Sequence, residues 1–322
     1  MTESLGLLIY AIAAGTVGAA ALRRARWPEQ APRLGVAAWQ TLSSSILVAL
    51  LLAGLVLVVP SGVMSTSLAE TLDACVMALR AQYATPGGAV LHATGVAATL
   101  TLGTRVAYLL VKGLRDARRA GADHLRGLQL VAHRNPGLDA LVVDHPAAAA
   151  YCLPGRAATI VLTSAAVAAL SDQELVAVLA HERAHLRGRH HLVAAAASAL
   201  ARSLPFVPGL QWARAEQSRL LEMIADDEAA AGGARLSVAR ALLTLAGATV
   251  PSAGLGAADV AAVARVERML VPASRIGVGR RVLIGAMLGV TAMAPLAIAS
   301  APAVLAAEMG YCPIAASTSV IV

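Results

Sequence analysis

The chain has 322 residues, of which 58% are hydrophobic and only 14% are charged. Together with a mean hydropathy of +0.69, this composition excludes an ordinary soluble domain and predicts an integral membrane protein. The formal net charge of +7 comes from basic residues that lie beside apolar segments, so it does not indicate direct binding to nucleic acid.

Four apolar segments are each close to the ~20 residues that a transmembrane helix requires. They are residues 4–22, 42–59, 90–111 and 283–306. The first is not expected to be a cleaved signal peptide, because Glu3 precedes it and Arg23 follows it, the reverse of the order in a secretory signal. The sequence therefore predicts a membrane domain over residues 1–111 with three spans, followed much later by a fourth span.

Basic residues are unevenly distributed among the loops that connect these spans. Four arginines lie between the first two spans, and several more basic residues follow the third span. By contrast, Arg80 is the only basic residue among residues 61–88. Because basic loops stay in the cytoplasm, the N-terminus is predicted to be external and residues 112–282 cytoplasmic. Residues 307–322 then form a short external tail, and the basic residues beside the membrane would also contact anionic lipid.

Residues 181–185 have the sequence His-Glu-Arg-Ala-His. Two histidines four positions apart lie on one face of an α-helix, where both imidazoles can bind one Zn²⁺. Glu182 lies beside them, where hydrolysis of a peptide bond needs a general base. His190 and His191 fit the ligand spacing less well and are interpreted as polar residues that close the helix.

A catalytic zinc site has three protein ligands and keeps the fourth tetrahedral position open for water or substrate, so a third ligand is needed. Glu222 can supply it from a second predicted helix, and Asp226, one turn further on, is placed to orient a ligating histidine. Arg219, one turn before Glu222, is either a transition-state stabiliser or a surface or lipid-facing arginine.

The apolar stretch 192–210 cannot cross the membrane once, because the two histidines and Glu222 would then lie on opposite sides. Arg202 and the break at Pro205–Gly209 predict a helix followed by a turn. We expect a hairpin buried at the membrane face, and its entry into the bilayer is left open.

Three runs rich in branched residues, bounded by Pro or Gly, predict strands of a small sheet at 128–131, 140–143 and 159–163. The last run comes just before the zinc helix. It is interpreted either as an edge strand that binds the substrate backbone or as an ordinary core strand. The residues concerned are Ala157, Thr159, Val161 and Thr163.

Beyond the zinc motifs, the order of the spans and the segments Tyr151–Gly155 and Arg265–Leu270 make the chain resemble the BlaR/MecR antirepressor family of bacterial membrane zinc metallopeptidases. The zinc helix is shared with the related HtpX-like and prenyl-protein endopeptidases. The single late span and the connector Trp27–Gln40 favour the antirepressor branch. The resemblance implies an α-helical integral protein of the bacterial plasma membrane with a cytoplasmic α+β zincin-like metalloprotease domain.

The same resemblance implies a signal-activated endopeptidase that cleaves a cytoplasmic transcriptional repressor, or itself, in an antibiotic response. A short form without the penicillin-binding sensor domain is expected, since the only lysine, Lys112, has Leu109 three positions before it instead of a serine nucleophile. Two alternatives are a general quality-control protease of the membrane and a non-proteolytic scaffold that contains zinc. A homodimer is left open.

The three cysteines are expected to lie on two sides of the membrane. Cys75 and Cys312 are external in this topology, where they either form a disulfide or remain two unpaired thiols. Cys152 is cytoplasmic and is expected to stay reduced.

Overall fold

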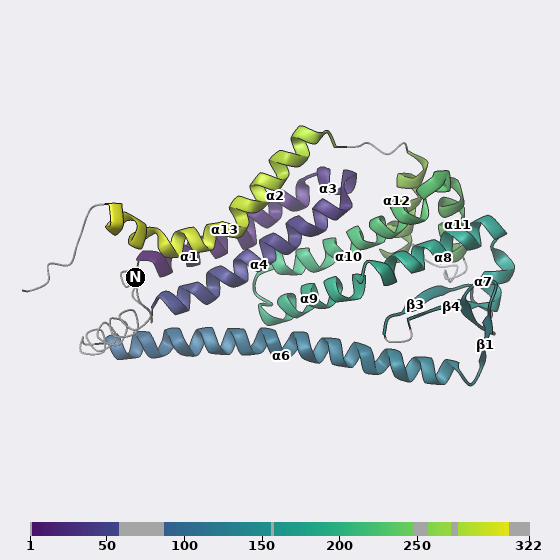
Figure 1. The fold of residues 1–322 in the computed structure, drawn as a ribbon, viewed down its shortest axis with the longest axis horizontal. Coiled ribbons are helices and arrows are strands. Elements are labelled where there is room, and N and C mark those ends of the chain that lie inside the picture. Colours follow the sequence, from purple (N-terminus) through teal and green to yellow (C-terminus); the bar gives the residue numbers. More distant parts are fainter. Residues whose placement is uncertain (1, 58–86, 156–157, 248–256, 272–275, 309–322) are drawn as a thin grey trace, which may run out of the picture.

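The computed structural model describes residues 2–57, 87–155, 158–247, 257–271 and 276–308. Within these residues a group of long helices occupies one end of an elongated molecule, and a small sheet with shorter helices occupies the other (Figure 1).

Four helices are long and apolar enough to cross a membrane, as the sequence predicts. The first comprises α1 (Thr2–Ala13), the π-helical turn η1 (Ala14–Gly18) and α2 (Ala19–Arg24); the others are α4 (Pro32–Val56), α6 (Gly88–Leu128) and α13 (Val278–Glu308). A short helix, α3 (Trp27–Gln30), connects the first two. These four helices indicate a membrane protein.

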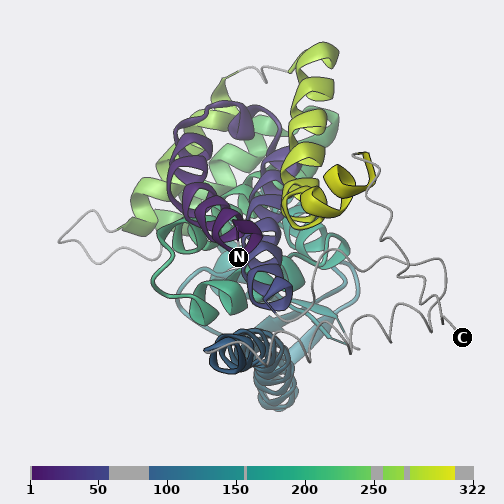
Figure 2. The same ribbon diagram turned by 90° about the vertical axis from the view of Figure 1, so that its left-hand side faces the viewer.

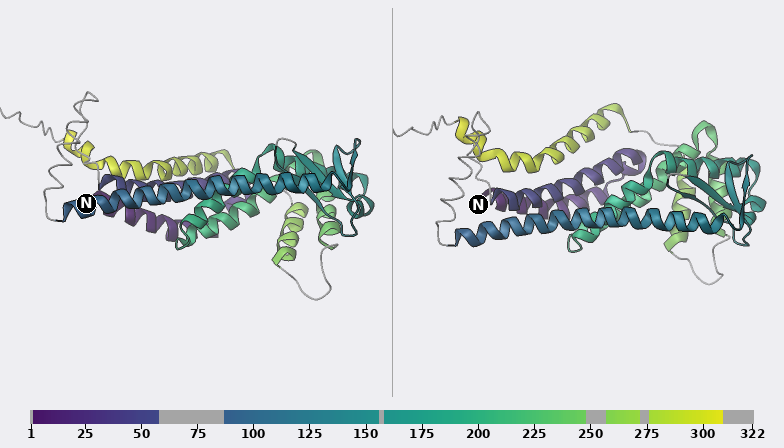
Figure 3. Two further views of the ribbon diagram at one scale, coloured as in Figure 1. Left: turned by 90° about the horizontal axis from the view of Figure 1, so that it is seen from below. Right: turned by 60° about the horizontal axis from the view of Figure 1, so that its bottom comes forward.

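The helix α6 continues well beyond the predicted end of the third span at residue 111 (Figures 1 and 3). Leucine, arginine and alanine, which favour helices, dominate the added segment. As a result α6 runs from the apolar end of the molecule to the sheet. The prediction of a strand at 128–131 is wrong for the same reason, because the helix ends at Leu128 and the strand begins only at Ala132.

The helices α1 and α13 both pack against α4, and Trp39 and Ile46 of α4 are almost fully buried in the shared core. On another side of α4, Gly54 approaches Gly95 of α6 so closely that a Cβ atom at Gly54 would lie 2.8 Å from the Gly95 carbonyl oxygen. Small residues of this kind let two helix backbones approach inside a membrane. Figure 2 shows α1, α4 and α13 grouped together, with α6 at the opposite side.

The apolar stretch 192–210 forms a hairpin, which confirms the predicted helix and turn. Its arms are α9 (His190–Ser203) and α10 (Pro208–Ala229), and Pro208 begins the second arm. The turn packs against η1, because a Cβ atom at Gly209 would lie 2.7 Å from the Cβ of Ala19 and would also collide with the carbonyl oxygen of Gly15. The hairpin is therefore part of the helical core and does not lie on its surface.

The sheet has four strands, β1 (Ala132–Asn135), β2 (Ala140–Val143), β3 (Ala150–Leu153) and β4 (Thr159–Thr163), in the order β1-β2-β4-β3. The pairs β1/β2 and β3/β4 are antiparallel, and β2/β4 is parallel. Thus β4 lies between two strands and β3 lies at the edge.

The interpretation of residues 157–163 as an edge strand is therefore wrong. The backbone groups of β4 are paired with β2 on one side and with β3 on the other, so a substrate cannot add to it. Val161 lies in both pairings, and Thr163 pairs with β2 and hydrogen-bonds to Ala149, whereas Thr159 pairs with Leu153 of β3. Ala157 lies outside the described residues. The alternative interpretation as a core strand is correct, since Ile160, Val161 and Leu162 are almost fully buried.

The helices α7 (Ser164–Ala169) and α8 (Asp172–Arg187) follow β4. The capping box that begins α8 includes Glu174, whose carboxylate accepts a 2.8 Å hydrogen bond from the backbone N–H of Ser171. Leu175 and Leu179 of α8 pack onto the sheet. A 3-10 turn, η2 (Ala231–Gly233), precedes α11 (Arg235–Gly247), which packs against both α8 and α12 (Ala257–Leu270).

Candidate metal centre

Three side chains from two helices converge at one point beside the sheet. The Nε2 atom of His181 lies 3.1 Å from Nε2 of His185 and 3.5 Å from Oε2 of Glu222. The Nε2 atom of His185 lies 3.4 Å from Oε1 of Glu222. The structure therefore brings the three predicted ligands together from α8 and α10.

The spacing of these donor atoms fits zinc. Two donors that each lie about 2.0–2.1 Å from a tetrahedral zinc ion are about 3.4 Å from one another. The three observed distances, 3.1, 3.4 and 3.5 Å, lie close to this value. Two imidazoles and one carboxylate are also a ligand set of catalytic zinc sites, which keep their fourth position for water or substrate.

The second nitrogen of His181 is held by a buried carboxylate. Its Nδ1 atom lies 3.0 Å from Oδ1 of Asp226, whose side chain has no exposed surface. This contact leaves Nε2 as the ligating atom and fixes the orientation of the ring. The role predicted for Asp226 from its position one turn after Glu222 agrees with this geometry.

An arginine that sequence reasoning missed holds both carboxylates of α10. Arg265 of α12 donates hydrogen bonds of 2.8 and 2.7 Å to the two oxygens of Asp226. Its Nη1 atom also lies 3.1 Å from Oε2 of Glu222. Burial alone would raise the pKa of the Asp226 carboxyl, but the Arg265 guanidinium outweighs it and holds that pKa below its usual value.

The electrostatics of the site favour a cation. Burial lowers the pKa of His181, but hydrogen bonds to Asp226 and Glu222 outweigh it and raise the pKa to about 9. Burial keeps His185 neutral and lowers its pKa to about 4. Because carboxylates surround His181 more closely than arginines do, the local potential stabilises positive charge at the point where the ligands meet.

His185 is oriented by His190, for which the sequence predicts only a role in closing the helix. The Nδ1 atom of His190 lies 2.9 Å from Nδ1 of His185, and His190 is 6% exposed. Between the two helices, Arg189 adopts a left-handed conformation with φ 49°. This conformation reverses the chain so that the first residue of α9 folds back over the last turn of α8.

Replacing His190 by alanine is expected to lower the zinc affinity of the protein about 10- to 100-fold, because the ring of His185 loses the partner that orients it. Competition with a chromophoric chelator measures the affinity. The matched control is His191→Ala, since His191 is exposed and the hydrogen bond to His185 comes from His190. Equal affinities for the two variants would mean that His190 does not orient the ligand.

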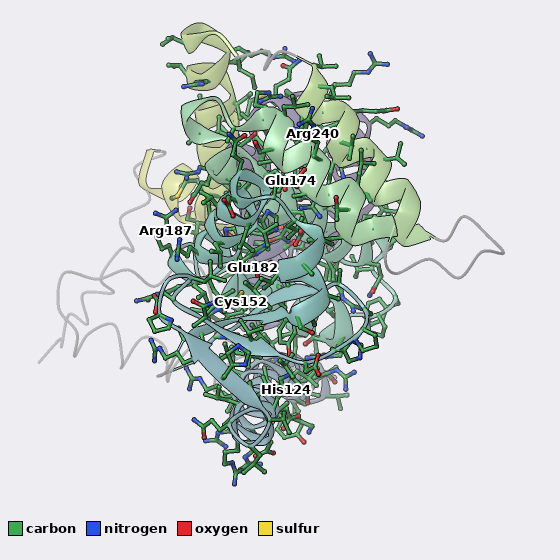
Figure 4. All side chains as sticks on the ribbon, turned by 90° about the vertical axis from the view of Figure 1, so that its right-hand side faces the viewer. His124, Cys152, Glu174, Glu182, Arg187 and Arg240 are labelled. Atoms are coloured by element: carbon green, nitrogen blue, oxygen red, sulfur yellow. The ribbon has the colours of Figure 1, made fainter. Side chains whose placement is uncertain are left out.

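The proposed general base, Glu182, is 9% exposed, and burial raises the pKa of its carboxyl. Its neighbour on the edge strand is Cys152, and Figure 4 shows the two side chains close together. Burial, the charge of Glu182 and a hydrogen bond with it raise the pKa of the Cys152 thiol to about 12. The predicted free thiol at Cys152 is present in the structure.

The thiol of Cys152 is expected to resist alkylation at neutral pH, because only the thiolate reacts. In a Cys75→Ser/Cys312→Ser background, the rate of iodoacetamide labelling should still rise above pH 9, where the rate for the unfolded chain levels off. Replacing Glu182 by glutamine removes the neighbouring charge and should accelerate labelling. If the labelling rate of the folded protein levels off near pH 9, the high pKa of the Cys152 thiol is contradicted.

Arg219 does not belong to this centre. Its guanidinium donates hydrogen bonds of 2.9 Å to Glu29 and 3.0 Å to Glu216, so the transition-state role predicted for it is not supported and the alternative of a surface arginine holds. Cys75 and Cys312, the predicted disulfide pair, lie outside the described residues.

Two cavities flank the centre, with volumes of about 330 and 260 Å³. Glu222 lines both of them. The edge strand β3 passes from one to the other, since Ala150 lines the larger cavity and Cys152, followed by Pro154, lines the smaller. The arrangement provides an unpaired strand edge, among the described residues, directly beside the ligands and Glu182.

Residues 123–275 match the family model described as Peptidase family M48. The matched region contains the sheet, the three ligands, Glu182 and Arg265. No curated protein and no solved structure matches the chain. The match indicates a protease, and peptidases of this family are generally zinc-dependent, in agreement with the donor set.

Proposed function

We propose that the chain is a membrane-embedded zinc endopeptidase that acts on proteins at the cytoplasmic face. The observation that carries the proposal is the convergence of His181, His185 and Glu222 at zinc-like distances beside the buried Glu182. A purely structural zinc site is closed by four protein ligands and has no use for a base beside it. The described group has three ligands and such a base, which argues against a scaffold.

Each side chain of the centre has a separate role in the proposed peptide hydrolysis. Zinc held by the three ligands would supply a Lewis acid for the scissile carbonyl and the attacking water. Glu182 accepts a proton from that water and delivers it to the nitrogen of the leaving amine. Its raised pKa suits this exchange, because a general base works best when its pKa lies near the working pH. Arg265 and Asp226 keep the ligands in place.

We propose that the substrate backbone binds along β3. This strand is paired only with β4 among the described residues, and it borders both cavities. An extended peptide can add to such an edge through main-chain hydrogen bonds. The backbone would then cross the centre with the scissile bond beside Glu182.

The proposed topology agrees with the arrangement of the helices. The N-terminus, the end of α4 and the beginning of α6 lie at one end of the molecule, and the metal centre lies toward the other (Figure 1). The basic residues between the first two spans and after the third lie toward the metal centre, which by the positive-inside rule is the cytoplasmic side.

The hairpin extends deeply into the membrane in this arrangement. Gly15, which contacts the hairpin turn, is nine residues from Arg24 at the end of the first span. At 1.5 Å per residue the contact lies about 14 Å from that end, near the middle of a hydrocarbon core about 30 Å thick.

Two continuous helices connect the membrane to the site and support a regulated enzyme. The helix α10 begins at the hairpin turn and carries Glu222. The helix α6 extends from its span to the edge strand, where His124 Nε2 and the Tyr151 hydroxyl form a 2.7 Å hydrogen bond. A signal that shifts either helix would move a metal ligand or the substrate strand. We therefore propose low basal activity and activation through the spans.

The proposed substrate is a small cytoplasmic DNA-binding repressor, with self-cleavage as a further event. The runner-up is quality control of membrane proteins. Proteomics of cells that carry wild-type protein or Glu182→Gln separates the two under the inducing condition: one intact repressor in the variant supports the first, and many accumulated membrane proteins support the second.

In vitro, Glu182→Gln is expected to lower the rate of peptide hydrolysis by about 10²- to 10⁴-fold with unchanged zinc content, because only proton transfer is lost. The measurement uses full-length protein in detergent. Glu267→Gln on the exposed face of α12 is the matched control. If the control and Glu182→Gln cleave equally well, the chain does not use this centre for hydrolysis.

A further inference from the structure

A third cavity, with a volume of about 270 Å³, lies between two of the proposed spans, α4 and α13. It shares no lining residue with the two cavities at the metal centre. The residues that line it are Gln40, Thr41, Ser44, Ser45, Val48 and Ala292. Four of these six side chains are polar and none is charged, which is an unusual lining for a cavity between membrane helices.

The proposed orientation of the spans puts this cavity inside the hydrocarbon core of the bilayer. Arg33 lies at the cytoplasmic end of α4, and Gln40 and Val48 follow it by seven and fifteen residues. At 1.5 Å per residue, the lining extends from about 10 Å to about 22 Å beyond Arg33, in a core about 30 Å thick. Hydroxyl and amide groups without a hydrogen-bond partner are costly at this depth, because no bulk water is present to pair with them.

Most of the polar groups in the lining lack a partner within the part of the chain that the structure describes. The Ser45 hydroxyl donates a 2.9 Å hydrogen bond to the Leu42 carbonyl, whereas the side chains of Gln40, Thr41 and Ser44 form no such bond. Gln40 and Ser44 are also exposed, so a molecule dissolved in the bilayer can reach them. Hydrogen bonds from a bound molecule would remove the cost of leaving these groups unpaired.

A polar contact between three helices borders the cavity and leaves one further acceptor open. Pro295 of α13 has no N–H, so the carbonyl of Thr291 lacks its usual helical partner. The Tyr10 hydroxyl of α1 lies 3.0 Å from that carbonyl oxygen and 3.1 Å from Oγ of Ser45. The hydroxyls of Tyr10 and Ser45 have only two hydrogens for three contacts, so Oγ of Ser45 can accept a hydrogen bond from a ligand.

We propose that this cavity binds an uncharged amphiphile that carries a hydroxyl or amide group, supplied either by a membrane lipid or by a smaller lipid-soluble molecule. The uncharged lining offers no partner to an ionised headgroup. Because a cavity of roughly 150 Å³ holds benzene, the volume here admits the polar group together with part of an alkyl chain. The inference rests on the proposed placement of the spans in the membrane and does not depend on peptide hydrolysis.

The test uses full-length protein in phosphatidylcholine vesicles and a photoreactive octanol that carries a diazirine. The control probe is the same diazirine compound without the hydroxyl group. Mass spectrometry identifies the labelled residues. The alcohol should label residues 40–48 of α4 in a saturable manner, and the control probe should label only lipid-facing surfaces without saturation. Competition by dioleoylglycerol would identify a lipid as a source of the ligand, whereas competition by octanol only would restrict the site to smaller molecules.

Two pairs of variants test the lining. Gln40→Leu combined with Ser44→Ala removes two hydrogen-bonding groups and should weaken saturable labelling about 5- to 150-fold, whereas Thr101→Val removes a polar group from the exposed face of α6 and should have no effect. Ala292→Phe fills the cavity and should abolish saturable labelling, whereas Ala286→Phe on another exposed face of α13 should preserve it. The Gln40 and Ser44 variant places apolar groups in hydrocarbon, so it keeps the test decisive if Ala292→Phe does not fold.

The results separate this proposal from its premise. Equal labelling of the cavity by both probes would mean that lipid chains fill it. Labelling of the exposed Val290 of α13 without labelling of α4 would mean that a helix of another protein or of a second copy covers the cavity. Either result overturns the proposal. If the control probe labels none of the four proposed spans, their placement in the membrane is wrong and the proposal falls with it.

Discussion

Metal analysis of the purified protein is expected to find one zinc ion per chain, and none in His181→Ala or His185→Ala. Each variant removes one of three ligands, and the remaining pair cannot hold the metal against buffer and chelator. The same variants should lose all peptidase activity. Inductively coupled plasma mass spectrometry of protein in detergent gives the stoichiometry directly.

The control for this experiment is His133→Ala, because His133 lies on β1, away from the centre, and is exposed. Its zinc content should equal that of the wild type. Retention of zinc by a variant that lacks both His181 and His185 would remove the basis of the peptidase proposal, and so would a wild-type protein that binds no zinc when it is refilled.

Arg265→Gln is expected to destabilise the protein by about 3–5 kcal/mol, because it leaves the buried Asp226 without its main cationic partner. Zinc affinity should also fall, since both Asp226 and Glu222 lose the group that positions them. Thermal unfolding in detergent reports the loss of stability, and competition with a chelator reports the affinity.

Arg268→Gln provides a closely matched control one turn later on the same helix. Arg268 makes an equivalent two-bonded contact of 2.8 Å with Asp227, but Asp227 is 39% exposed and touches none of the ligands. The expected loss is therefore only about 0–1 kcal/mol, with unchanged zinc affinity. Equal effects of the two variants would show that Arg265 only attaches α12 to α10.

The features that the sequence predicts correctly depend on residues close together along the chain. His181 and His185 share a face because they are four residues apart, and Glu222 and Asp226 share one for the same reason. The spans follow from the lengths of their apolar segments. The distance between the two helices that carry these pairs is set by packing. The four residue types and their spacing are nevertheless sufficient to predict a zinc site.

What the sequence does not predict depends on chain segments that meet only after folding. The position of Arg219, one turn before Glu222, leaves two roles open for it, and only the folded chain shows that its side chain turns toward Glu29 of another helix. Arg265, which reaches the site, is far along the chain from Asp226. Similarly, the order of the strands is not encoded locally, so a buried strand such as β4 could not be distinguished from an edge strand.

The core that includes Leu7 of α1, Trp39 of α4 and Leu220 of α10 has a practical consequence for biochemistry. The helix that supplies Glu222 buries one side against the helices of the membrane and another against α8. A fragment that begins after the third span would expose to water the side of α10 that packs against α4. The helix α10 would then lose the partners that position Glu222. The enzyme is therefore expected to work only as an intact membrane protein, and attempts to excise its catalytic half should yield aggregates.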